Sequence, residues 1–205
     1  MEVETFPALR LPRIRHGFTT RSTGDLVHLE AEMQSTYAAL GFPMERAAWG
    51  EQPHGNRVAS VTGPGRVPGV DALSTATTGL PLLVRVADCG PVYFFDPVRR
   101  VIALAHSGRR GTEGNIVAET VAHLIDAHGT KPSDLIVELG PCIRPPHYEV
   151  DFAAEIGRQA QRAGVVHYAD CGLCTACDLT RYYSYRAEKG KTGRMWAALM
   201  LDNIR

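Results

Sequence analysis

Apolar residues in this chain recur mostly in short runs bounded by glycine, proline and polar residues, a pattern typical of β-strands. Asp96 and Pro97 separate two of the runs and predict a tight hairpin turn between them. The pattern therefore predicts more strands than helices. The predicted strands are 13–20, 57–62, 82–86, 92–95, 101–105, 135–139 and 196–201.

Helical spacing appears in three places, each closed by a glycine. Residues 29–40 end at Gly41, the apolar positions from Ile116 to Ile125 continue to Gly129, and residues 152–163 end at Gly164. The glycines and prolines of 63–69 predict a loop. Short hairpins outnumber strand–helix alternation, so we expect an α+β fold, a single domain over 1–205 with mixed β-sheets flanked by helices.

Composition and charge restrict the possible functions. The chain has 205 residues, with 22 Lys plus Arg against 22 Asp plus Glu, and no long block of like charge. A neutral surface gives no field to attract a polyanion, so nucleic acid and anionic membrane are excluded as partners. An odd number of cysteines, no apolar signal segment in 1–10 and no membrane-length apolar run predict a cytoplasmic protein with reduced thiols.

Three potential metal ligands lie beside glycine or proline where predicted strands end. They occur in Gln52-Pro53-His54-Gly55, Ala87-Asp88-Cys89-Gly90-Pro91 and Ala105-His106-Ser107-Gly108. Two imidazoles and a thiolate match a catalytic zinc site, which leaves a fourth position for water or substrate. Their separations are too long for a finger-type site, and the alternative is that these are ordinary core and surface residues.

Other polar residues have two interpretations each. Asp88 suits either an acid/base role beside the metal or a turn-forming role, and Asp71 suits a helix or turn cap better than catalysis. Cys142 is expected to fill space beneath a turn, and the alternative is a nucleophilic pair with His147. Arg186 and Arg194 are expected to bind backbone or carboxylates near the C-terminus, and the alternative is anion binding.

Seven short motifs in order resemble the YfiH-like laccase-domain family over nearly the whole chain. They are QPHG at 52–55, DALST at 71–75, VADCGP at 86–91, AHSGRRGT at 105–112, GPCI at 140–143 with YEV at 148–150, SYR at 184–186 and TGR at 192–194.

The resemblance implies the YfiH/cytotoxic-necrotising-factor-like fold and a cytoplasmic zinc enzyme, with copper as the alternative metal. The implied reactions are phosphorolysis of adenosine, inosine, guanosine and S-methyl-5′-thioadenosine, and deamination of adenosine. The implied metal ligands are His54, Cys89 and His106, which with Asp88 form the predicted catalytic set. The expected partners are a purine nucleoside and phosphate, and the expected state is a monomer or small homo-oligomer.

Two departures from the family pattern affect the substrate side. Arg109 stands where the family typically has tryptophan, and the stretch after Thr19-Thr20-Arg21 is abbreviated. Phosphorolysis requires an anion site, for which Arg21, Arg109 and Arg110 are the predicted cations, helped by the glycine-flanked loop that opens a helix at 108–111.

Three alternative functions remain at this level. One is a copper polyphenol oxidase, for which a single His/Cys/His site lacks the several coppers required. Another is a thiol or zinc amidase that edits a peptidoglycan precursor. The third is a zinc or redox-sensing module built on Cys171, Cys174 and Cys177, whose spacing suggests a second metal site or a loop with oxidisable thiols.

Overall fold

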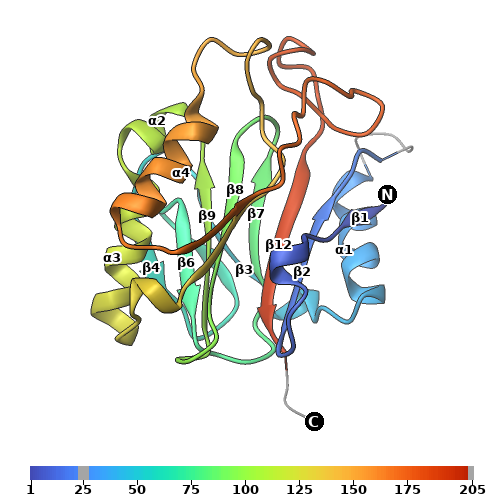
Figure 1. Cartoon of the computed structure of the whole chain (residues 1–205). Helices are drawn as coiled ribbons and strands as arrows, with labels where there is room; N and C mark the ends of the chain where they lie inside the picture. Colours follow the sequence, from blue (N-terminus) through green and yellow to red (C-terminus); the bar gives the residue numbers. More distant parts are fainter. Residues whose placement is uncertain (23–27, 203–205) are drawn as a thin grey trace.

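Two six-stranded sheets lie face to face in the computed structural model, which describes residues 1–22 and 28–202 (Figure 1). The first sheet has the order β1 (Val3–Glu4), β2 (Ile14–Thr19), β12 (Met195–Leu201), β7 (Leu82–Val86), β3 (Ala48–Gly50), β5 (Gly65–Val67). The second has the order β11 (His167–Asp170), β10 (Ile136–Leu139), β8 (Gly90–Asp96), β9 (Val101–Ser107), β6 (Ala72–Thr75), β4 (Val58–Ser60).

Both sheets are mixed. In the first sheet β2, β12 and β7 are antiparallel, whereas β3 and β5 join in parallel. In the second, β8 and β9 form the predicted hairpin, and β11 and β4 pair in parallel with β10 and β6. This arrangement confirms the expected α+β fold with mixed sheets.

Helices cover the outer face of each sheet, which gives four layers (Figure 1). The helix α1 (Leu29–Ala39) packs on the first sheet. The helices α3 (Ile116–His128) and α4 (Phe152–Arg162) pack on the second, with the short α2 (Arg109–Glu113) following β9. None of the described helices is long and apolar enough to cross a membrane. Three short 3-10 helices are η1 (Pro7–Leu9), η2 (Met44–Arg46) and η3 (Pro132–Asp134).

The strand β9 is buried on both faces, because it lies between the first sheet and the helices. Ile102 and Leu104 belong to the core between the sheets, while Ala103 and Ala105 pack on the helical side. Since side chains alternate along a strand, His106 shares the face of Ile102 and Leu104. The alternation thereby aims a histidine at the end of the space between the two sheets.

One local prediction from the sequence is wrong: residues 65–67 of the predicted loop form β5, because the backbone pairs with β3 at Ala48 to Gly50. Of the two cap alternatives for Asp71, the helix cap is excluded, because residues 72–75 that follow it form β6. The abbreviated stretch after Arg21 includes residues 23–27, which lie outside the described residues.

Candidate active site

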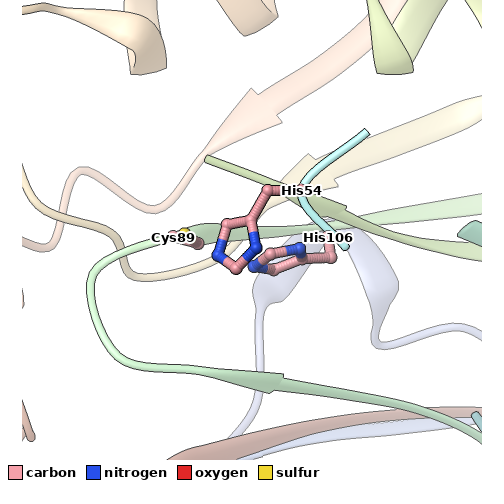
Figure 2. A group of neighbouring side chains, drawn as sticks. All are labelled: His54, Cys89 and His106. Atoms are coloured by element: carbon pink, nitrogen blue, oxygen red, sulfur yellow. The ribbon is translucent and has the colours of Figure 1, made fainter. Parts of the chain in front are cut away.

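The three predicted ligands meet at one end of the sheets, although they come from different elements (Figure 2). His54 lies in the loop after β3, Cys89 directly precedes β8, and His106 is near the end of β9. Their potential ligand atoms all lie within 4.8 Å of one another. The two imidazole rings are 4.8 Å apart between centroids and nearly perpendicular, at 80°. Such a cluster can hold one metal ion with a coordination position left open.

Asp71 holds both histidines in place from the edge of β6. Its two carboxylate oxygens accept the backbone N–H groups of His54 and Gly55, at 2.9 and 2.7 Å. The same carboxylate lies 2.9 Å from Nδ1 of His106, which must donate because an ionised carboxylate only accepts. This leaves Nε2 of His106 with its lone pair for a metal. The turn-capping part of the prediction for Asp71 agrees with these contacts, but its bond to His106 was missed.

Electrostatics favour the thiolate form of Cys89. Burial alone would raise its pKa, but hydrogen bonds and charge from His106 and His54 lower the pKa to about 6. Burial disfavours the charged form of His106, yet its bonds to Asp71 and Cys89 raise the pKa to about 9. A thiolate is the form that binds a metal or acts as a nucleophile.

Gly108 makes room for the sulfur of Cys89. A β-carbon at this position would lie 2.5 Å from Sγ of Cys89. Contacts this short require atoms to move, so only glycine allows the start of α2 to approach the thiolate so closely. Glycine is therefore required at position 108 for a steric reason, which the motif alone does not reveal.

Asp88 is buried, and both of its carboxylate oxygens are bonded. They accept from the hydroxyl of Thr175 at 2.8 Å and from the backbone N–H of Arg186 at 2.7 Å. Its backbone has a φ of +88°, a strained value for a residue other than glycine. These contacts fasten the segment of Cys89 to the segments around Thr175 and Arg186. They agree with a structural role, and the acid/base role stays a prediction.

A cavity of about 690 Å³, called here the metal-side cavity, opens beside the three ligands. Four arginines line it: Arg85, Arg109, Arg186 and Arg194. Glu149 pairs with Arg109 at 3.6 Å and with Arg186 at 3.0 Å, while Arg194 donates to the backbone oxygens of Thr192 and Gly193. The predicted carboxylate and backbone contacts of Arg186 and Arg194 are thus confirmed, and their position in the cavity wall is compatible with the anion-binding alternative.

Of the three predicted phosphate-binding arginines, Arg109 alone is among the described residues that line this cavity. Arg21 packs over the ring of Tyr183 at 4.3 Å and forms an ion pair with Glu188. Arg110 is exposed on α2 outside the lining. Arg85 lies in none of the motifs, and the sequence does not indicate it, because the fold brings it from β7 to the cavity.

The other cysteines form no comparable group. Cys142 is buried, as expected, and its burial raises its pKa far above the ordinary value. Within residues 1–22 and 28–202, the cluster of His54, Cys89 and His106 is the one group of three converging metal ligands. The CGLCTAC segment therefore supplies no second metal centre among the described residues.

Comparisons with known proteins agree with the fold. A family model described as multi-copper polyphenol oxidoreductase laccase matches residues 16–156 and 150–202. A purine nucleoside phosphorylase of Deinococcus radiodurans is 33% identical over 243 aligned positions, covering 98% of this chain and 95% of that protein. A purine nucleoside phosphorylase of Streptomyces griseus, ORF3, is 40% identical, covering 80% of this chain and 82% of that protein. The crystal structure of YlmD from Geobacillus stearothermophilus has a TM-score of 0.88 at 27% identity and covers 97% of this chain and 94% of its own.

Proposed function

The chain belongs to the multi-copper polyphenol oxidoreductase laccase family, and from this premise we propose that it is a purine nucleoside phosphorylase with a zinc ion held by His54, Cys89 and His106. The similar proteins of Deinococcus radiodurans and Streptomyces griseus, both named purine nucleoside phosphorylases, support the reaction class. The observation that carries the proposal is the convergence of three metal ligands on a cavity lined by four arginines. Such a cavity suits an anionic co-substrate beside a metal.

The donor set fits zinc. Two imidazoles, one thiolate and a carboxylate that orients an imidazole are typical of a catalytic zinc site. The described residues contain a single such group, whereas several coppers are required for four-electron oxygen chemistry, so the copper polyphenol oxidase is the weaker candidate. When bound, zinc would supply Lewis-acid chemistry beside the substrate.

In the proposed reaction, an oxygen of inorganic phosphate forms a bond to C1′ of the ribose while the bond from C1′ to the purine nitrogen breaks. The base leaves with the bonding electron pair and takes up a proton. Arg109, Arg186 and Arg194 are the groups that we assign to hold the phosphate, because they line the cavity and are donors in a planar fork. Asp71 keeps His106 oriented, and Asp88 stays the candidate for moving the proton.

The first experiment is an assay of the purified protein with zinc on inosine and adenosine, with and without phosphate. We expect hypoxanthine and adenine to form only when phosphate is present, and guanosine and S-methyl-5′-thioadenosine to react likewise. Adenosine deamination is tested in the same assay by inosine formation without phosphate. Absence of base release from every nucleoside would contradict the proposal.

The second experiment compares two thiols. Cys89→Ala should lose the bound metal and at least a hundredfold of activity, whereas Cys177→Ala, which removes an exposed thiol, should keep both. Metal content by elemental analysis and phosphate-dependent base release are the two measurements. Metal loss in Cys177→Ala would instead favour the sensing module around Cys171, Cys174 and Cys177.

One observation favours a second candidate, an amidase. The order Cys89, His106, Asp71 matches the nucleophile, base and orienting carboxylate of thiol acyl transfer. Incubation with a peptidoglycan-precursor amide followed by mass spectrometry separates the two. An acyl adduct on Cys89 would contradict its use as a zinc ligand.

A further inference from the structure

A second cavity, of about 640 Å³, lies next to the metal-side cavity, and we call it the tryptophan cavity. The two share three lining residues: Glu51, Gln52 and Arg85. Gln52 and Arg85 form a fixed boundary, because the Gln52 side-chain amide donates to the Arg85 backbone oxygen at 2.7 Å and its oxygen accepts the Arg85 N–H at 3.0 Å. The two cavities therefore adjoin at Gln52 and Arg85.

Aromatic and thioether side chains form the wall of the tryptophan cavity. Trp49 on β3 is 39% exposed although most large apolar side chains are buried. Trp196 on β12 is far from Trp49 in the sequence but lines the same cavity, together with Met33 and Met44. The Nε1–H of Trp196 is buried without a hydrogen-bond partner among the described residues. Exposed indole faces are platforms for flat heterocycles, and sulfur atoms pack well against rings.

The metal-side cavity is the more positively charged of the two. It has four arginines against Glu51 and Asp88, whereas the tryptophan cavity has three glutamates, Glu30, Glu45 and Glu51, against Arg66 and Arg85. Carboxylates repel a phosphate but accept hydrogen bonds from the N–H groups of a purine. The charge contrast therefore suits phosphate on one side of the boundary and a nitrogenous base on the other.

We propose that the tryptophan cavity binds the purine base of the nucleoside, stacked on Trp49, while the ribose lies across Gln52 and Arg85. This inference rests on the proposed function, because it assigns the parts of the same substrate to the two cavities. Base–aromatic stacking contributes enough that removing the ring weakens binding about tenfold.

Intrinsic fluorescence provides a direct test, because the chain has two tryptophans and both line this cavity. Titration of the zinc-loaded protein with hypoxanthine should quench the emission with saturation, and titration with inorganic phosphate should leave it unchanged. Unchanged emission at hypoxanthine concentrations that equilibrium dialysis shows to be saturating would overturn the assignment.

Kinetics of Trp49→Ala and Trp49→Phe supply the matched comparison. The alanine variant should raise the KM for inosine about tenfold with the KM for phosphate unchanged, while the phenylalanine variant, which keeps a ring, should stay within about threefold. Far-UV circular dichroism and zinc content check that both variants fold.

The two proposals fail differently. If the protein cleaves inosine but Trp49→Ala has the wild-type KM for inosine, the base assignment is wrong and the phosphorylase proposal stands. If no nucleoside is cleaved while hypoxanthine quenches the emission, the base site stands and the phosphorylase proposal is wrong.

Discussion

Asp71 is the residue on which the geometry of the candidate metal ligands depends most, although it is not itself a candidate ligand. It is 1% exposed and binds the backbone of His54 and Gly55 as well as the ring of His106. Asp71→Asn keeps the size but replaces an acceptor oxygen by an N–H donor. We expect zinc affinity to fall about 10- to 100-fold, as for other changes behind a metal ligand.

Competition with a chromophoric chelator measures this loss of affinity. Asp126→Asn is the control, because Asp126 is exposed on α3 outside the metal-side cavity, and its zinc affinity should equal that of the wild type. An Asp71→Asn protein with wild-type affinity would show that the carboxylate does not orient His106.

The sequence identifies the three candidate ligands but not the residues that support them. His54, Cys89 and His106 each stand beside glycine or proline in a recognisable motif. The role of Asp71 depends on the register that places Ala72 opposite Ala105 between β6 and β9. The roles of Arg85 and Arg194 depend on the pairing of β7 with β12. The register between strands that are distant in the sequence is set by tertiary packing, so local sequence patterns do not predict it.

At the scale of elements, the junction of β9 and α2 is tested by adding one methyl group. In Gly108→Ala the new β-carbon would lie 2.5 Å from the sulfur of Cys89, so either the thiolate or the start of α2 must move. We expect at least a tenfold loss of zinc affinity and a decrease of about 1–3 kcal/mol in the free energy of unfolding, the usual cost of overpacking.

Gly63→Ala is the matched control, since nothing lies within 4 Å of a β-carbon built there. Chelator competition and urea denaturation should give wild-type values for it. Equal zinc affinity in the two alanine variants would contradict the close packing of Gly108 on Cys89.

Long periodic segments were predicted well, and short strands were not. The helices α3 and α4 and the strands β7, β8 and β9 lie close to their predicted bounds. The helices have apolar residues at helical spacing, and the strands contain continuous apolar runs. The strands β3 and β5 have three residues each and lie among glycines and prolines. They form because neighbouring strands provide hydrogen-bond partners, and the local sequence does not show which strands will be neighbours.

At the scale of the whole molecule, His16 between the two sheets makes stability depend on pH. Its Nε2 accepts the N–H of Phe6 at 2.8 Å, and its ring packs near that of Tyr93. Burial and then the charge of Arg10 lower the pKa of His16 from 6.5 to about 4. Below pH 6.5, His16 binds a proton in the unfolded chain but stays neutral in the folded chain. The free energy of unfolding therefore falls as the pH drops towards 4.

We expect His16 to account for about 2–3 kcal/mol of lost unfolding free energy between pH 7 and pH 4. Urea denaturation at pH 7 and pH 4 measures the change, and His16→Gln, which keeps an acceptor for Phe6, should show a smaller decrease. His147→Gln, at an exposed histidine, should follow the wild type. An identical pH dependence in all three proteins would rule out this role for His16.

The position of β12 has a consequence for how the protein is made. This strand pairs with β2 on one side and β7 on the other. On the ribosome, β2 and β7 emerge long before residues 195–201, so the first sheet has an unfilled place at its centre for most of synthesis. Trp196 and the neighbouring Arg194 arrive with the same strand. A partly synthesised chain that lacks residues 194–201 is therefore without part of the wall of both cavities.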